Sequence, residues 1–387
     1  MNALQVKSRW IEDIEEFKQI AGQWDEALEK SGSENPFLLS DFILTWWKHY
    51  RRASALRIFL LYDGDGITGG VPFVMGKNGY LVYVGGVWAN YTEVLSTGDG
   101  GLVWDALLEA LNVSKEWESV RLPRVRKSGL LDMSRMGRFA NLSVRACFSD
   151  LSYLIKVPVD FSGYADTLPK KLRYHVRRSE KGFSLMGRLE LTTREDCSGA
   201  DKLFDRFVRM SRDSLKARNE RSNFEDERVC VFFRDIVNTM CLAGYLCAHA
   251  LELDGEPVAI HLGYCVGRNF NYVLPAFDIR YAELNPGHLL IYKLIELSAK
   301  RGNEYFDMYS GGSLYKRQWS DVRQEVFTVE IWRNTFANSI RKKLHYGLSA
   351  AKQAVKNNRK AYDLVKRLKK KSAWISGFLR RQPGARA

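Results

Sequence analysis

The chain has 387 residues, and 45% of them are hydrophobic, so it can build the cores of two ordinary domains. No run reaches the roughly 18 apolar residues of a membrane-spanning helix, and the acidic Glu12 and Asp13 argue against a secretory signal. We therefore expect a globular, cytoplasmic protein. Its six cysteines form no CxxC pair, which predicts reduced thiols rather than a zinc site or a disulfide framework.

The net charge is concentrated at the C-terminal end. The chain carries +14 overall, and residues 334–387 hold 15 Lys or Arg against the single acid Asp363, so the rest of the chain is neutral. This asymmetry indicates a basic tail on a neutral body and makes nucleic acid a disfavoured partner.

Apolar residues in this tail recur at helical spacing, and the basic residues fall away from them. The apolar stripe comprises Ile340, Leu344, Leu348, Ala351, Val355, Tyr362 and Val365. A basic amphipathic helix of this kind, followed by more apolar residues at 374–379, suits an anionic membrane surface and predicts a peripheral protein at its inner face. The alternative is a helix that docks on the body and keeps its basic face in water.

The first part of the chain predicts an α+β unit. Helices are expected over 11–30, from 40 onward and over 104–111. Ser40 and Asp41 are the expected N-cap of the second helix. Strands are expected over 4–6, 56–62, 67–75, 80–88, 119–122 and 143–157. The turns DGDG and GKNG join three of these strands into a meander.

The second part repeats this order. Helices are expected over 168–183, 200–216, 226–240 and 289–300, and strands over 188–192, 245–253, 257–266, 269–275 and 305–309. The shared succession suggests two copies of one α+β architecture. We predict domains at 1–157 and 158–333, followed by the tail at 334–387.

The segment NPGHLL opens the helix expected over 289–300, with Pro286 and Gly287 at its start. A helix entered through a Pro-Gly turn presents unpaired N–H groups and the positive end of its dipole, which suits a phosphate or pyrophosphate. Most such helix starts bind nothing, so this signal needs context.

The stretch YFDMYSGGSLYKRQW at 305–319 places one carboxylate, Asp307, in a strand of aromatic and apolar residues. A partly desolvated carboxylate with a raised pKa can act as a general base. It can equally pair with Lys316 or brace the Ser-Gly-Gly turn. Tyr309 is either a proton donor or a core residue. If Asp307 is a base, Tyr315, Lys316 and Trp319 would form the lip of the site. If Asp307 is structural, the same three residues would form a packed corner.

One basic stripe on the helix over 168–183 is formed by Lys170, Arg173, Arg177 and Lys181. An acceptor that bears phosphates, such as a nucleotide sugar, a lipid-linked saccharide or a tRNA, would need such cations. A solvated helix face is the alternative.

Four segments, in this order, resemble the CelD/BcsL-type acetyltransferases of the GNAT superfamily. They are NPFLLSDFILTWWKHY, LPKKLRYHVRRSEKGF, LDGEPVAIHLGY and NPGHLLIYKLIELSAKRGNEYFDMYSGGSLYKRQW. The resemblance spans about residues 35–319 and leaves out the basic tail. Those proteins are tandem GNAT-fold enzymes, similar in plan to Fem-type peptidyltransferases and often associated with exopolysaccharide or envelope biosynthesis.

The resemblance implies two GNAT-like domains with mixed, mostly antiparallel sheets flanked by helices. It implies that the second domain binds an acyl-CoA donor through Pro286, Gly287, His288 and Leu289, although the usual Gln/Arg-x-x-Gly-x-Gly/Ala loop is reduced here to NPGHLL. On the basis of this resemblance, we predict that the catalytic residues are Asp307, Tyr309 and Lys316. We predict as acceptor-binding residues Lys170, Arg173, Arg177, Tyr315 and Trp319. No metal is implied.

We expect an N-acyltransferase that moves an acyl group, with acetyl-CoA as the first choice of donor, to an amine such as an amino sugar or an envelope polysaccharide precursor. Two alternatives stay open. A Fem-like transferase that uses aminoacyl-tRNA would need a basic groove on the body. A non-catalytic scaffold of polysaccharide biosynthesis would be anchored by its tail.

Overall fold

The computed structural model describes residues 7–51, 54–64, 66–129 and 139–357, with side chains up to residue 347. The chain divides into two compact units, and the division falls after Trp332. The strand predicted over 4–6 lies outside the described residues, and the first strand that is described, β1, spans Lys7–Ile11.

The N-terminal half of the larger unit begins with helices and continues into a meander. Its helices are α1 Ile14–Ser31, α2 Ser40–Tyr50 and α3 Gly100–Val113. Its further strands are β2 Ala55–Asp63, β3 Gly66–Gly76, β4 Tyr80–Tyr83, β5 Leu95–Ser96, β6 Ser119–Arg126 and β7 Leu142–Lys156. Strands β2, β3 and β4 pair antiparallel, and β6 lies parallel to β4 after the crossover through α3.

The C-terminal half repeats this succession. Its helices are α4 Tyr164–Thr167, α5 Lys170–Ser184, α6 Cys197–Ala217, α7 Glu227–Leu242, α8 Pro286–Lys300 and α9 Leu314–Trp319. Its strands are β8 Leu189–Thr193, β9 Leu246–Leu253, β10 Glu256–Val266, β11 Asn269–Phe277, β12 Tyr305–Ser310 and β13 Val322–Arg333. Strands β9, β10 and β11 pair antiparallel, and β12 lies parallel to β11 after α8. The predicted α+β class with two copies of one architecture is confirmed.

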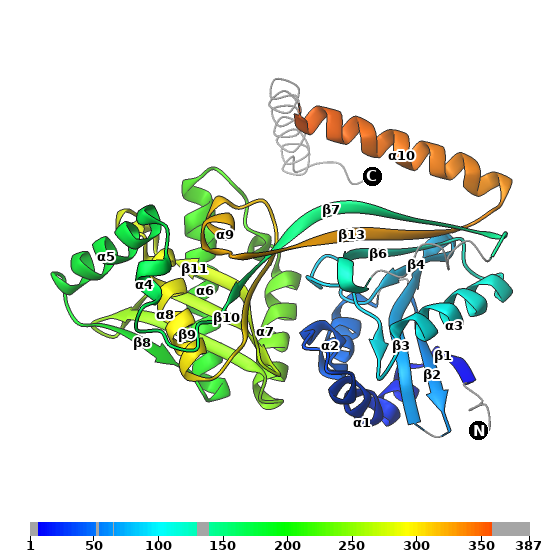
Figure 1. The fold of residues 1–387 in the computed structure, drawn as a ribbon, viewed down its shortest axis with the longest axis horizontal. Helices are drawn as coiled ribbons and strands as arrows, with labels where there is room; N and C mark the ends of the chain where they lie inside the picture. The colour runs from blue at the N-terminus through cyan, green and yellow to red at the C-terminus, as the bar shows by residue number, and fades with distance from the viewer. Residues whose placement is uncertain (1–6, 52–53, 65, 130–138, 358–387) are drawn as a thin grey trace, which may run out of the picture. The chain divides into compact units, whose positions relative to one another are not determined.

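Strands β7 and β13 are exchanged between the halves (Figure 1). The end of β7 pairs with β12, where Leu154 lies opposite Asp307. Strand β13 returns to pair with β6, where Trp332 lies opposite Ser119. Because β7 and β13 are also neighbours, one sheet runs through both halves in the order β1-β2-β3-β4-β6-β13-β7-β12-β11-β10-β9-β8. The predicted domain limits, 1–157, 158–333 and 334–387, stay a prediction.

The two faces of the C-terminal sheet contact different cores. Phe306 and Met308 of β12 are buried with the apolar residues of α8, whereas Tyr309 is buried with those of the N-terminal half. Since successive residues of a strand point to opposite faces, Asp307 faces away from α8. Its hydrogen bond from Tyr91 of the N-terminal half agrees with this orientation.

Two local predictions are wrong. Ser40 is the first residue of α2 rather than its N-cap, and its hydroxyl donates a hydrogen bond to Asp25. Strand β4 ends at Tyr83 rather than at residue 88, because Gly85 and Gly86 adopt positive φ angles of 90° and 52° and turn the chain. After this turn, Thr92 forms an isolated parallel bridge with Val125 of β6.

Cys197 and Cys241 form a disulfide, which corrects the prediction of reduced thiols at these positions. Cys197 begins α6 and Cys241 lies in the last turn of α7, so the bond joins helices that pack side by side. Their Cα atoms are 5.7 Å apart although 44 positions separate them in sequence. The pairing therefore arises from tertiary packing, which residue spacing alone does not reveal.

The smaller unit contains helix α10, Phe336–Asn357. Ile340 and Leu344 of the predicted stripe lie on this helix, whereas its members from 348 onward lie outside the described side chains. Residues 358–387, with the apolar residues at 374–379, lie outside the described chain. In the described part, no helix combines the length and apolar character needed to cross a membrane, and no group of three or more His, Cys, Asp or Glu is placed to hold a metal ion.

Candidate active site

The N-terminus of α8 is open. The helix follows Asn285, which adopts a left-handed conformation with φ 52° and makes no side-chain cap. Pro286 has no N–H, and the N–H of Gly287 has no hydrogen-bond partner among the described residues. The N–H groups of His288 and Leu289 already donate to the carbonyl of Asn285, so this helix start offers the Gly287 N–H and a positive dipole end to an anion.

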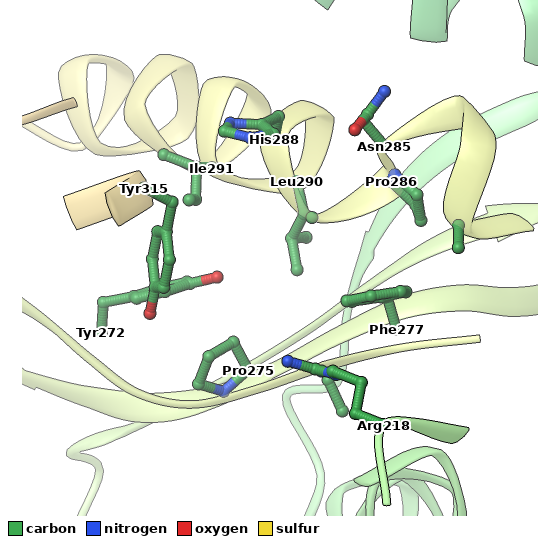
Figure 2. Close-up of a pocket in the computed structure, with 13 residues that line it drawn as sticks. Arg218, Tyr272, Pro275, Phe277, Asn285, Pro286, His288, Leu290, Ile291 and Tyr315 are labelled. Atoms are coloured by element: carbon green, nitrogen blue, oxygen red, sulfur yellow. The ribbon is translucent and has the colours of Figure 1, made fainter. Parts of the chain in front are cut away.

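A pocket of about 410 Å³ lies against this helix start (Figure 2). One wall is the first turn of α8, and the facing wall is the C-terminal part of β11 with Tyr272, Pro275 and Phe277. Tyr315 of α9 lies beside Tyr272, and Arg218 lies on the side of the pocket facing α8. The pocket therefore combines an apolar floor, an open helix start and one cation.

The predicted donor-binding residues separate into two groups. Pro286, Gly287 and His288 line the pocket, whereas Leu289 is fully buried in the core beneath it and Leu290 takes its place in the wall. Tyr315, predicted to bind the acceptor, lines this same pocket.

The equivalent helix of the N-terminal half is closed. Helix α3 lies between the meander and β6, which is parallel to β4, but Asp99 caps it by accepting a 2.8 Å hydrogen bond from the N–H of Gly101. This carboxylate already occupies the position that an anionic ligand would take. Of these two helices, α8 is the one whose start is open to an anion.

His288 anchors α9 and α5 to the rim of the pocket. Its Nδ1 accepts a 2.9 Å hydrogen bond from the indole N–H of Trp319, and its ring stacks on His175 at 5.4 Å. Desolvation, with the nearby His175, lowers the pKa of His288 to about 4, so the ring is neutral at pH 7. Trp319 is only 3% exposed and serves here as a packing anchor of α9.

Asp307 is fully buried, and its two oxygens differ. Oδ1 accepts hydrogen bonds from the Tyr91 hydroxyl at 3.0 Å and from the N–H of Tyr309 at 2.7 Å. Oδ2 has no partner among the described residues. Burial raises the pKa of Asp307 to about 6, even though the Tyr309 N–H and the nearby Arg126 lower it. The carboxyl is thus ionised at neutral pH and able to take up a proton.

Asp307 also holds an irregular piece of backbone. Tyr309 has a φ of 60°, which is unusual for a bulky residue, and the pairing of β12 with β7 shifts register between Asp307 and Ser310. The hydrogen bond from the Tyr309 N–H fixes this shift. The Tyr309 hydroxyl, whose pKa is raised by burial, donates to Asn271 at 2.8 Å.

Lys316 makes no ion pair with Asp307, and both side chains belong to the described residues. Its ammonium donates instead to the carbonyl of Ser310 at 2.9 Å and so holds the turn after β12. Desolvation lowers the pKa of Lys316 to about 8, while the charge of Asp307 acts in the opposite direction. The alternative in which Asp307 and Lys316 brace each other directly is therefore wrong.

The basic stripe lies elsewhere. Lys170, Arg173 and Arg177 line a separate groove of about 730 Å³ along α5, together with Arg178, Lys181 and the apolar Leu185 and Leu284. Asp166 pairs with Arg173 at 3.1 Å and approaches Arg177 at 3.9 Å. Since Leu284 precedes Asn285, this groove borders the turn that opens α8.

Several of these residues carry no sequence signal. Arg218 stands at the end of α6 and is placed in the pocket only by the packing of that helix, where its guanidinium also bonds Ser214. Tyr91 and Arg126 come from the N-terminal half. The Tyr91 hydroxyl donates to Asp307, and the charge of Arg126 acts on the same carboxylate. Only a three-dimensional fold brings these segments together.

Residues 170–317, from α5 to α9, match the acetyltransferase (GNAT) domain. This part of the chain has the GNAT fold. No curated protein matches the sequence.

Three solved structures share the fold over most of the chain. One is FemX, with 11% identity and a TM-score of 0.61, covering 84% of this chain and 96% of that one. Another is the C-terminal domain of a putative lysylphosphatidylglycerol synthetase from Agrobacterium fabrum, with 10% identity, a TM-score of 0.53, and 84% and 95% coverage. A third is a conserved protein of unknown function from Bacteroides thetaiotaomicron, with 12% identity, a TM-score of 0.52, and 85% and 100% coverage. At these identities the likeness concerns the fold.

Proposed function

We propose that this protein is an N-acyltransferase that moves an acyl group from acyl-CoA, with acetyl-CoA as the first candidate, to a primary amine. The observation that carries the proposal is the pocket at the open start of α8. The Gly287 N–H and the helix dipole would hold the pyrophosphate, and Arg218 adds a charge on the facing side. The contrast with the capped start of α3 supports the assignment of the donor to the C-terminal half.

The divergence of β11 and β12 supports a path for the acyl group. The two strands pair only from Asn269–Tyr305 to Asn271–Asp307, and beyond that point their backbone groups are free of each other. An acyl thioester that enters from the pocket beside Tyr272 would meet this split, where backbone N–H groups can polarise its carbonyl.

Asp307 is the proposed base on the other side of the split. The neutral amine forms the new C–N bond, the C–S bond breaks, the amine proton goes to the carboxylate, and the departing thiolate takes a proton in turn. Tyr309 is the proposed source of that last proton, and the proton taken up by Asp307 restores its hydroxyl, so that both groups return to their starting forms. In this proposal Lys316 acts as a positioning residue that holds the turn after β12.

A second candidate is a Fem-like transfer from aminoacyl-tRNA, and one observation favours it. The groove on α5 places five cations on the body of the protein, where that function would need them. This candidate would be supported if the wild type binds tRNA tightly and Arg177→Glu does not. If the wild type does not bind tRNA, or if Arg177→Glu binds it equally well, the acyl-CoA enzyme is favoured.

The acyltransferase proposal also includes membership of the CelD/BcsL type, a role in polysaccharide biosynthesis and attachment to a membrane. These three points stay predictions.

The test is the binding of acetyl-CoA to the Gly287→Glu variant by calorimetry. A side chain at this position finds only an ordinary 3.8 Å contact with Phe277, so the fold should tolerate it while the carboxylate occupies the anion position. The matched control is Gly100→Glu, at the start of the capped helix α3 and in open space. We expect the first variant to lose binding and the second to keep it. Equal affinity in both would remove the donor site from α8.

A further inference from the structure

A second pocket lies between the two halves of the larger unit, apart from the pocket at α8. It measures about 230 Å³ and is bounded by residues 31–34, by residues of the 93–96 segment, by Arg126 of β6 and by Asn269 of β11. Most of the residues that line it are polar.

The polar groups of this pocket are mostly hydrogen-bond acceptors. Glu93 pairs with Arg126 at 2.9 Å, so these two charges compensate each other. Glu34 accepts a 2.6 Å hydrogen bond from the N–H of Arg268 and forms no ion pair with any cation in the described ranges. The pocket therefore holds one carboxylate without a cationic partner, which favours a positively charged ligand.

Asn269 adds a buried acceptor to the same wall. Its side chain is only 7% exposed, and its Nδ2 donates to Asn271. Its Oδ1 has no partner among the described residues. A buried acceptor of this kind is unfavourable unless a donor reaches it, and a ligand in the pocket can supply one.

Two chains of contacts lead from this pocket to Asp307. Arg126 lies over the ring of Tyr91 at 4.7 Å, and the Tyr91 hydroxyl donates to Asp307. On the other side, Asn269 donates to Asn271, which accepts from the hydroxyl of Tyr309. Asn269, Asn271 and Asp307 share one face of the sheet, opposite the face on which Tyr272 lines the donor pocket.

We propose that this second pocket binds the acceptor, and that the acceptor is a small hydroxylated primary amine of the amino-sugar class. On binding, Glu34 and the Asn269 oxygen would hold its ammonium group, and Ser31, Ser33 and Ser96 would hold its hydroxyls. The amine would then lose its proton to Asp307 when it reaches the split between β11 and β12. The donor then approaches from the α8 face and the acceptor from the Asp307 face, and they meet where β11 and β12 diverge. The identification of the ligand as an acceptor rests on the proposed acyltransferase function.

The experiment measures the binding of D-glucosamine to the full-length protein by calorimetry without any donor. We expect D-glucosamine to bind, and D-glucose and N-acetylglucosamine, which lack the ammonium, to bind at least tenfold more weakly. Glu34→Gln keeps an oxygen for the Arg268 N–H but removes the charge, and should weaken D-glucosamine binding about tenfold or more. Glu220→Gln, at an exposed glutamate, is the matched control and should bind as the wild type does.

Ser33→Phe fills the pocket without altering its charge and should also abolish binding, so the proposal can be tested even if Glu34→Gln fails to fold. Equal binding of D-glucosamine and D-glucose, or wild-type affinity in both variants, would overturn the proposal. Because acetyl-CoA binding is measured separately, the two proposals fail separately. D-glucosamine binding without acetyl-CoA binding would refute the acyltransferase, and acetyl-CoA binding without D-glucosamine binding would refute the acceptor pocket.

Discussion

Replacement of Asp307 by asparagine should stabilise the folded protein at neutral pH. Asparagine keeps an oxygen that can accept from Tyr91 and from the Tyr309 N–H, so the register shift in β12 is retained. The variant removes a charge that is fully buried and that has one oxygen without a partner. A direct ion pair with Lys316 would have predicted the opposite result, a large loss of stability.

The magnitude follows from the pKa. Burial raises the pKa of Asp307 from its ordinary value of 3.8 to about 6. Between these two values the folded state binds more protons than the unfolded state, so stability falls as the pH rises through this window. At about 1.4 kcal/mol for each pH unit, the ionised carboxylate costs about 3 kcal/mol at pH 7.5. The gain in the variant should be somewhat smaller, because Lys316 loses an attractive charge.

The assay is urea unfolding, followed by tryptophan fluorescence, at pH values between 4 and 8. The free energy of unfolding of Asp307→Asn should exceed that of the wild type by about 2–3 kcal/mol at pH 7.5, and the difference should vanish near pH 4. Asp213→Asn, at an exposed aspartate, should show no such pH-dependent difference. A variant that is less stable than the wild type at pH 7.5, or a difference that does not change with pH, would refute the reasoning.

Activity, thiol content and surface binding provide further checks. Asp307→Asn should lower kcat about 100-fold or more, and the activity of the wild type should decline as the pH falls through about 6; an unchanged kcat excludes this base. Denatured protein should titrate four thiols with Ellman's reagent before reduction and six afterwards, and six without reduction would contradict the Cys197–Cys241 bond. Deletion of residues 334–387 should release the protein from anionic vesicles without changing turnover on a soluble amine, whereas failure of the full chain to bind them at low salt would contradict membrane attachment.

Local sequence patterns predict most of the elements that surround the candidate site. The apolar runs at 245–253 and 257–266 and the DGEP turn between them correspond to β9 and β10. The Pro-Gly start predicts where α8 begins, because the rule depends only on neighbouring residues. Patterns of this kind are local, and the physical cause acts within one helix or one hairpin.

The parts that could not be predicted depend on distant segments. Strand β13 is not among the strands expected from the sequence. No hairpin turn signal precedes it, and its partner β6 lies far away in the sequence. The partner of Asp307 could not be predicted either, because it comes from a distant segment. Tyr91, rather than the nearby Lys316, donates a hydrogen bond to its carboxylate. The strain at Tyr309 is likewise imposed by the sheet and leaves no trace in residue type.

The exchange of β7 and β13 sets the earliest point during synthesis at which the sheet can be completed. Roughly 200 residues separate Ser119 in β6 from its partner Trp332, and a ribosome needs about 10–40 s to add them at ~5–20 residues per second. During that interval the edge of β6 that faces β13 in the finished sheet has no strand to pair with, and an open edge of this kind invites association with other chains. Nascent chains that terminate before residue 322 are therefore the form of this protein most in need of a chaperone.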